Sequence, residues 1–205
     1  MKNVAVIIDS LAGGGAERVM LTLAQEMIAQ GNTVTFFSLK ENVDHIVPDE
    51  IDVVFPFKGN KASLRSWFSG HQYAAVLSAA IKTVEAQKQP FDLVLVNLLE
   101  SYRLAHLINL KNCFYVIHNS FNKELQREKL MGPIKYWYMR KIIKRMSDKQ
   151  LVAVSDGVAQ ELKTASLYNA SSVTTIYNPF DIARIKSLSN ETTEQLPLEK
   201  YILHV

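Results

Sequence analysis

Three consecutive glycines, Gly13, Gly14 and Gly15, lie between a short apolar run and a stretch of helical periodicity. Glycine lets the backbone approach a ligand closely, and the N-terminus of a helix presents free N–H groups and a partial positive charge. Arg18 follows in the first turn of the expected helix and can add a cation. The arrangement predicts an anion-binding turn, and the alternative is a tight strand-to-helix turn that binds nothing.

The spacing of this turn separates it from two nucleotide-binding motifs. A P-loop requires Gly-Lys-Ser/Thr after its spacer, and this turn has none. The dinucleotide-binding fingerprint would place a third glycine at position 18, where Arg18 stands instead. Glu41, just beyond the second predicted strand, could imitate the acid that binds a ribose. A nicotinamide-dependent oxidoreductase therefore stays open as an alternative.

A second candidate for chemistry is His118, which ends the predicted strand Phe114–His118. Open α/β sheets place ligand-contacting residues at the carboxyl ends of their strands. The alternative is a histidine whose hydrogen bonds are satisfied within a loop. No metal site is indicated, because the acids are scattered and no carboxylate or histidine cluster has ligand spacing. Cys113 is the only cysteine, which excludes an internal disulfide and a thiolate metal cluster.

The elements that must position these residues are short apolar runs alternating with helical stretches, a pattern typical of a parallel sheet wrapped by helices. The runs show little polar alternation, which indicates strands buried on both faces. The predicted strands are Val4–Ile8, Val34–Leu39, Val53–Phe55, Leu93–Asn97, Phe114–His118, Leu151–Val154 and Val173–Tyr177. The predicted helices run from the glycine turn to Gly31, along the apolar stripe Ala74–Val84, over Lys135–Ser147, and from a cap at Ser155 or Asp156. The predicted fold class is α/β, with helices on both faces of the sheet.

Composition places the chain among ordinary globular proteins. Its 48% hydrophobic and 21% charged residues exclude general disorder. No apolar run approaches the ~20 residues needed to cross a bilayer, and Val4–Ile8 is too short for a signal peptide. Together with the single cysteine, these features predict a soluble protein of the reducing cytoplasm.

The last residues predict a division of the chain. A polar stretch that begins at Ser187 is typical of a linker, and Tyr201–Val205 then begins a new apolar strand. This strand either joins the edge of the same sheet or opens a second domain, and we favour the second reading. We therefore expect a domain over residues 1–186, an interdomain linker over 187–200, and the first strand of a C-terminal domain over 201–205.

Four local motifs, in this order, carry a family resemblance. They are Gly13-Gly14-Gly15-Ala16-Glu17-Arg18, Val116-Ile117-His118-Asn119, Val152–Val158 and Thr175–Asp181. The chain resembles the N-terminal domain of family 4 glycosyltransferases, retaining enzymes in which two Rossmann-like domains face a cleft, the GT-B architecture. The resemblance covers nearly the whole chain. It implies that this is the acceptor-side half of such an enzyme.

The resemblance implies how a donor would be bound. Residues Gly13, Gly14 and Gly15 would lie against the diphosphate of a nucleotide-sugar donor that is held mainly by the C-terminal domain. Arg18 would offset charge that builds on the leaving group. The acidic pair that binds the donor sugar in this family lies in the C-terminal domain, so residues 1–205 alone are expected to be inactive. Neither a metal nor a cofactor is implied.

Other residues are implied at the cleft. His118 would reach the transferring sugar or the acceptor and is the catalytic candidate. The expected contacts with the acceptor or the rim are Glu17, Asn119 and Ser155. Glu17 is equally suited to stabilising the N-terminus of its own helix.

A basic, aromatic surface is predicted on the helix Lys135–Ser147. On a helical wheel its apolar side collects Tyr136, Met139, Ile142, Ile143 and Met146. The opposite side carries Trp137, Arg140, Lys141, Lys144 and Arg145. Tryptophan among cations suits a membrane interface, where each cation near anionic lipid contributes ~1 kcal/mol.

The charge around this helix is locally unbalanced. From Phe121 to Gln150 there are nine basic and three acidic residues, in a chain whose net charge is +3. Upstream, a second basic, aromatic stretch is expected to be a loop and contains Lys58, Lys61, Arg65, Trp67 and Phe68. Similar enzymes act on lipid-linked glycans, so the resemblance implies docking on the anionic inner leaflet. The alternatives are a solvated charged face and nucleic-acid binding, although no nucleic-acid motif accompanies the charge.

The sequence thus predicts a glycosyltransferase that moves a sugar from a nucleotide-sugar donor to a glycan or lipid-linked acceptor. The expected setting is bacterial surface polysaccharide synthesis, of lipopolysaccharide or capsule, at the inner face of the cytoplasmic membrane. The first alternative is a non-catalytic, degenerate transferase domain that serves as a scaffold. The second is the dinucleotide-dependent oxidoreductase.

Overall fold

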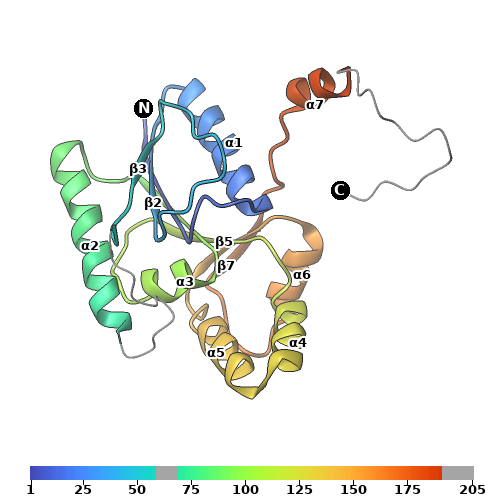
Figure 1. The fold of residues 1–205 in the computed structure, drawn as a ribbon. Coiled ribbons are helices and arrows are strands. Elements are labelled where there is room, and N and C mark those ends of the chain that lie inside the picture. Colours follow the sequence, from blue (N-terminus) through green and yellow to red (C-terminus); the bar gives the residue numbers. More distant parts are fainter. Residues whose placement is uncertain (59–68, 191–205) are drawn as a thin grey trace.

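The computed structural model describes residues 1–58 and 69–190. Over these residues the chain forms one seven-stranded, wholly parallel sheet in the order β3-β2-β1-β4-β5-β6-β7 (Figure 1). The strands are β1 (Asn3–Ile8), β2 (Thr33–Ser38), β3 (Asp52–Val54), β4 (Leu93–Asn97), β5 (Cys113–Ile117), β6 (Gln150–Ala153) and β7 (Ser172–Thr175). The α/β, Rossmann-like prediction is confirmed, and the seven strands predicted within the described residues are present within two residues of their expected bounds.

Helices cover both faces of the sheet. They are α1 (Gly15–Ala29), α2 (Gly70–Gln87), α3 (Leu99–Ala105), α4 (Phe121–Met131), α5 (Pro133–Lys144), α6 (Asp156–Thr164) and α7 (Ile182–Ser189). The side chain of Ser155 accepts a hydrogen bond from the backbone N–H of Val158, so Ser155 is the N-cap of α6. Helices α3, α4 and α7 were not among the predicted elements.

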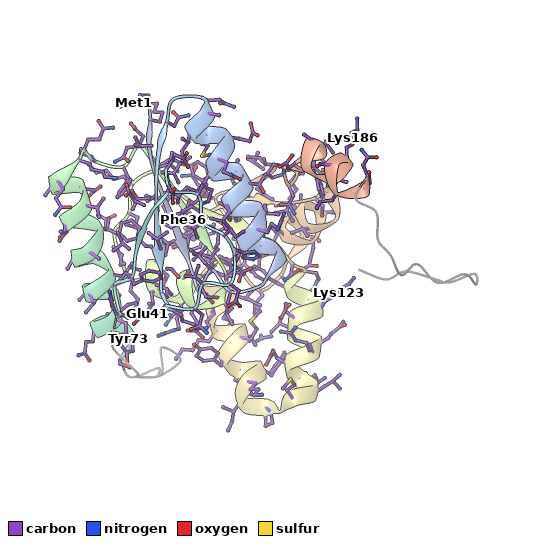
Figure 2. All side chains as sticks on the ribbon, turned by 45° about the horizontal axis from the view of Figure 1, so that its top comes forward. Met1, Phe36, Glu41, Tyr73, Lys123 and Lys186 are labelled. Atoms are coloured by element: carbon purple, nitrogen blue, oxygen red, sulfur yellow. The ribbon has the colours of Figure 1, made fainter. Side chains whose placement is uncertain are left out.

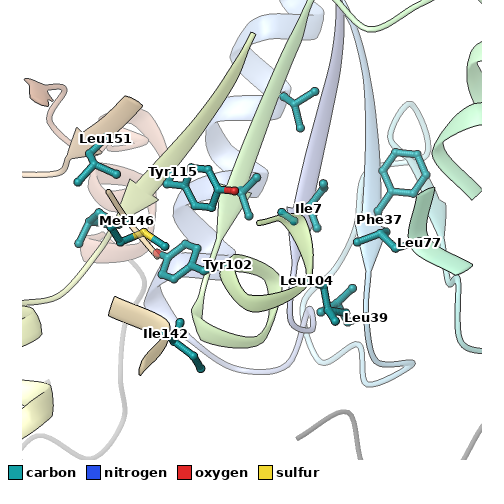
Figure 3. Packing of buried hydrophobic residues seen from close by; sticks show 14 of the residues in the cluster. Ile7, Phe37, Leu39, Leu77, Tyr102, Leu104, Tyr115, Ile142, Met146 and Leu151 are labelled. Atoms are coloured by element: carbon teal, nitrogen blue, oxygen red, sulfur yellow. The ribbon is translucent and has the colours of Figure 1, made fainter. Parts of the chain in front are cut away.

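Two apolar layers sandwich the sheet because strand side chains alternate between its faces. Val4, Val6 and Ile8 of β1 pack with α1 through Met20, Leu21 and Ala24. Ala5 and Ile7 point to the opposite face, where the core is completed by residues of α2, α3, α5 and α6. Figure 3 shows part of this second layer, with Tyr102, Tyr115, Ile142, Met146 and Leu151 at one end and Phe37, Leu39, Leu77 and Leu104 at the other. Continuous burial along β1 and β2 explains the lack of polar alternation in their sequences.

Helices α4 and α5 form a hairpin that projects below the sheet in Figure 1. Gly132 joins them with φ of +126°, a conformation that residues with a side chain rarely adopt. Pro133 follows at the first position of α5, where its missing N–H costs no hydrogen bond. This glycine–proline pair ends one helix and starts the next within two residues.

The C-terminal segment lies at the margin of the molecule. Helix α7, which contains Lys186, stands away from the sheet, whereas Phe36 lies inside the body (Figures 1 and 2). Residues 187–189, the start of the expected linker, belong to this helix. The rest of that linker from residue 191 and the expected strand 201–205 lie outside the described residues. So does the second basic, aromatic stretch, except for Lys58.

Candidate functional site

The strand order creates a switch point between β1 and β4. The chain moves outward from β1 to β2 and β3, and then returns to pair β4 with the other edge of β1. At such a point the loops that leave two adjacent strands diverge, which opens a crevice at the carboxyl edge of the sheet. Asp9 follows β1 directly, and Asn97 ends β4, so both lie at this crevice.

Asp9 anchors the start of α3. Its carboxylate accepts hydrogen bonds from the backbone N–H groups of Glu100 and Ser101, at 3.1 and 2.7 Å, and from the Ser101 hydroxyl at 2.7 Å. Desolvation by burial raises the pKa of Asp9 to about 6, although these hydrogen bonds act in the opposite direction. Leu98, between β4 and α3, has φ of +70°, a strained conformation for leucine. The strand-to-helix turn at the crevice is therefore held by a carboxylate.

A buried polar network lies behind this turn. Arg103 donates from Nε to the Glu100 carboxylate at 3.0 Å, and both side chains are almost wholly buried. The Tyr138 hydroxyl lies 3.0 Å from both oxygens of the same carboxylate. Since Tyr138 belongs to α5, the network ties the α4–α5 hairpin to α3. Removing the Tyr138 hydroxyl would take a hydrogen bond from a buried carboxylate, which makes this link costly to break.

His118 directly follows β5 and faces the crevice beside β4. Its Nε2 lies 2.9 Å from the Oδ1 atom of Asn97, whose side chain is fully buried. Burial lowers the pKa of His118 to about 4, so the ring is neutral at pH 7. A neutral imidazole can accept or donate a hydrogen bond, but it does not supply a positive charge to a diphosphate.

The glycine turn is explained in part by its own geometry. Gly13 has φ of +41°, in the left-handed region. A Cβ on Gly14 would lie 2.0 Å from Oε2 of Glu17, because the buried Glu17 carboxylate folds back over this glycine. A Cβ on Gly15 would meet no atom within 4 Å. Only Gly15 is thus without a structural reason to be glycine.

A cavity of about 760 Å³ opens between the carboxyl edge of the sheet and the α4–α5 hairpin. Its size suits a small-molecule ligand. Its apolar wall includes Leu98, Leu99, Tyr102, Ile117, Phe121, Met131, Ile134 and Met139. Its charged lining comprises Asp9, Glu17, Lys40, Glu100, Glu124, Arg127, Glu128 and Lys135. Such mixed walls suit a ligand that carries many hydroxyls on a partly apolar body.

The structure brings some of the predicted site residues together and separates others. Among the described residues, His118, Asn119 and Glu17 line the cavity. Arg18 is exposed in the first turn of α1 and is not part of this lining. The Ser155 hydroxyl is engaged as the α6 N-cap. The glycine turn therefore borders the site through Glu17, with a carboxylate close to the place where a diphosphate was expected.

The sequence analysis missed the polar residues that hold the strand-to-helix turn and contact His118. Asp9 and Asn97 stand at the ends of predicted strands, which is the signal that could have identified them. Glu100 and Tyr138 lie on helices without any such signal. Of the described residues, no group of three or more histidine, cysteine, aspartate or glutamate side chains could hold a metal ion.

The predicted membrane-facing residues divide into two sets. Trp137, Lys141 and Lys144 are exposed on α5, whereas Arg140 and Arg145 are half-buried. The Arg140 guanidinium lies 5.7 Å from the centre of the Trp137 ring, within the range of a cation–π contact. Desolvation and the nearby Arg103 charge lower the pKa of Arg145. The two arginines therefore face the protein more than the solvent.

The hairpin carries a second, apolar surface that the helical wheel did not reveal. Leu130 is 90% exposed, Met131 57%, Ile134 84% and Trp137 63%, and they cluster around the turn between α4 and α5. We refer to these residues as the hairpin tip. Met131 and Ile134 also line the cavity, so the tip forms one side of its mouth. In the described part of the chain, no helix is long and apolar enough to cross a membrane.

A parallel sheet with a cavity at its switch point defines a Rossmann-like ligand-binding domain. Residues 13–184 match the model of the family described as Glycosyltransferase Family 4. The chain belongs to this family. A comparison with curated protein sequences found no match. Because the glycine turn lies within the residues that match this family, it no longer argues for the oxidoreductase alternative.

Solved structures of similar fold are glycosyltransferases of GT-B architecture. Sucrose-phosphate synthase from Thermosynechococcus elongatus superposes with a TM-score of 0.64 at 13% identity, over 94% of this chain and 53% of that one. A glycosyltransferase from Rickettsia africae gives 0.58 at 18% identity, over 94% and 47%. The lipopolysaccharide outer core galactosyltransferase WaaB gives 0.54 at 18% identity, over 87% and 46%. The chain thus spans about half the length of these structures, and its fold is the Rossmann-like domain of GT-B enzymes.

Proposed function

We propose that this chain forms the acceptor-side domain of a retaining glycosyltransferase, which moves a sugar from a nucleotide-sugar donor to a hydroxyl of a glycan or lipid-linked acceptor. The observation that carries the proposal is the cavity at the switch point, where His118 faces a mixed polar and apolar space in a chain of this family. A C-terminal domain after the linker would hold most of the donor. Residues 1–205 alone would then be inactive.

In this proposal the neutral His118 ring contacts a hydroxyl of the transferred sugar or of the acceptor. The donor diphosphate approaches the backbone at Gly15, and Arg18 offsets part of its charge. Asn119, exposed beside His118, contacts the acceptor at the rim of the cavity. Glu17 would have to turn away from Gly14 before an anion could occupy the turn, because its carboxylate lies over this glycine and would repel a diphosphate bound there.

The first test is transfer by the complete enzyme, with a panel of nucleotide sugars as donors and membrane lipid extract as acceptor. His118→Ala is expected to lower kcat/KM by about 10²-fold, as a misplaced substrate commonly does. The matched control is His71→Ala, since His71 is exposed and does not line the cavity. Equal transfer by both variants would contradict the role of His118. A well-folded complete protein that transfers no sugar would favour the scaffold alternative.

The second part of the proposal is that the hairpin docks on the anionic inner face of a membrane, where lipid-linked acceptors of surface polysaccharide synthesis reside. Four exposed apolar side chains form the hairpin tip, and Lys135, Lys141 and Lys144 lie exposed around it. Apolar side chains can enter the headgroup region while cations attract anionic lipid. An enzyme docked in this way would be peripheral and would face the cytoplasm.

Vesicle co-sedimentation tests this docking. Binding to vesicles rich in phosphatidylserine is expected to be strong at low salt and to weaken as salt screens the cations. Leu130→Ser combined with Ile134→Ser should weaken binding about tenfold or more, since each substitution removes an exposed apolar side chain that the membrane would bury. Ile46→Ser is the matched control, because Ile46 is 91% exposed but belongs to the loop between β2 and β3. Equal binding to neutral vesicles, or equal loss in the control, would contradict the proposal.

A further inference from the structure

Asn97 is held in one orientation by the backbone around it. It ends β4, and its side chain is fully buried. Its Nδ2 amide group donates to the carbonyl oxygens of Ile7 and Leu95, at 3.4 and 3.3 Å. The opposite orientation would bring Oδ1 against two carbonyl oxygens, which repel it. The side-chain oxygen of Asn97 therefore points away from them, toward Nε2 of His118 at 2.9 Å.

This orientation decides which nitrogen of His118 carries the proton. An amide oxygen can only accept a hydrogen bond, so Nε2 of the ring must be the donor. A neutral imidazole has one N–H group, and the other nitrogen, Nδ1, then carries a lone pair. Since Nε2 is already engaged with Asn97, any hydrogen bond from the ring to a ligand uses Nδ1 as the acceptor.

We propose that Asn97 is a positioning residue that fixes His118 in the Nε2–H tautomer and thereby makes its ring a hydrogen-bond acceptor toward the cavity. The catalytic value of this arrangement rests on the proposed function of His118. The ring then selects a ligand group that donates a hydrogen bond, such as a sugar hydroxyl. A phosphate oxygen, which only accepts, gains nothing from it.

The tautomer can be observed without any ligand by long-range ¹H–¹⁵N correlation spectra of the labelled chain at pH 7. The two ring nitrogens resonate in different regions when protonated and unprotonated, and the His118 signals are assigned with His118→Gln. In the unsubstituted chain, Nε2 is expected in the protonated region and Nδ1 in the unprotonated one. A protonated Nδ1 in this spectrum overturns the proposal at once.

Variants then test whether Asn97 is the cause. Asn97→Ala should give a mixture of both tautomers, because it removes the oxygen that accepts from Nε2–H. The matched control is Asn3→Ala. Asn3 is equally buried, its Nδ2 donates to the backbone carbonyls of Gln89 and Pro90, and its Oδ1 accepts from Thr33. Asn3 lies at the amino-terminal end of β1, whereas His118 lies at the carboxyl ends of the strands, so Asn3→Ala should leave the His118 signals unchanged. An Asn97→Ala variant that keeps the pure Nε2–H tautomer overturns the proposal.

Transfer by the complete enzyme separates this inference from the proposed function. Asn97→Ala is expected to lower kcat roughly 10-fold to 10²-fold, and its effect should largely disappear in a His118→Ala background, because both variants remove the same contact. If the tautomer changes as expected while neither variant affects transfer, the positioning role of Asn97 stands and the proposed role of His118 falls. If His118→Ala abolishes transfer while Asn97→Ala changes neither the tautomer nor kcat, the reverse holds.

Discussion

Burial shifts the pKa of two titratable side chains at the cavity, His118 and Asp9, toward their neutral forms, and the two shifts have opposite effects on stability in acid. The pKa of His118 falls from its ordinary value of 6.5 to about 4, and that of Asp9 rises from 3.8 to about 6. Between pH 6.5 and 4 the unfolded chain binds a proton at His118 that the folded chain does not bind. Stability from His118 is therefore lost as the pH falls through this window. Between pH 6 and 3.8 Asp9 has the opposite effect on stability, because in this window the folded chain binds a proton at Asp9 that the unfolded chain does not bind.

We predict that His118→Gln makes the free energy of unfolding less sensitive to acid. The substitution removes one protonation difference, so the slope between pH 6.5 and 4 should become shallower by up to about 1.4 kcal/mol per pH unit. Urea unfolding at several pH values measures this slope. Asp9→Asn serves as the opposite control, since it removes the compensating proton and should steepen the loss. An identical slope in His118→Gln and the unsubstituted chain would show that the ring titrates normally in the folded state.

The sequence could single out a site residue where one strand end was informative, and it could not where a neighbouring strand was needed. His118 could be predicted because it directly follows an apolar run. The partnership of Asn97 with His118 depends on β4 and β5 lying side by side, which no local pattern encodes. Tyr138 reaches Glu100 only because α5 packs near α3. The prediction of the site was limited mainly by contacts between residues that are distant in the sequence, and less by the recognition of residue types.

At the scale of elements, the hairpin shows what amphipathic periodicity can and cannot reveal. The apolar side predicted for the helix Lys135–Ser147 is confirmed at Met139, Ile142, Ile143 and Met146, which are buried, whereas Tyr136 is only half-buried. Helix α4 was missed because Phe121 is its only buried residue, so its sequence has no apolar stripe. Its start is fixed instead by Ser120, which caps Lys123 and donates to Glu161 of α6. Local capping and tertiary contacts, in place of a core-facing stripe, define this helix.

The turn between β1 and α1 allows a prediction that separates glycines needed for the fold from those needed for a ligand. Gly14→Ala should destabilise the chain by roughly 1 kcal/mol, because alanine is a poorer helix N-cap than glycine and the Glu17 side chain must move away from the new Cβ. Gly15→Ala should stabilise it by about 0.5–1 kcal/mol, because space is open and the unfolded chain loses freedom. Urea unfolding measures both. If a donor approaches the backbone here, Gly15→Ala also loses sugar transfer in the complete enzyme. A more stable variant with full activity would place the donor elsewhere.

At the scale of the whole molecule, the C-terminal segment exposes several large apolar side chains close together in the sequence. Phe180 is 72% exposed, Ile182 55%, Ile185 52% and Leu188 50%, and the last three share one face of α7. The structures of similar fold are about twice as long as this chain. We propose that this face packs against the C-terminal domain in the complete enzyme.

We predict that residues 1–205 self-associate through this face. Sedimentation velocity should show a concentration-dependent rise in mass, and Ile185→Lys should abolish it, because a buried unpaired charge opposes the contact. Val76→Lys on α2 is the control, since Val76 is an exposed apolar residue far from α7. In the complete enzyme the same Ile185→Lys substitution should lower the melting temperature. A monomeric chain at all concentrations would contradict the prediction.

The strand order also dictates a sequence of events during synthesis. β1 and β2 can pair as soon as residue 38 has left the ribosome, but the other edge of β1 must wait for β4, where Val4 pairs with Leu93. Until then one edge of an apolar strand has no partner, and such edges promote aggregation. Among the interior strands of the finished sheet, β1 is therefore the one that spends longest with one edge unpaired. The nascent chain is therefore most exposed to pairing with other chains before β4 emerges, at a stage when the cavity has not yet formed.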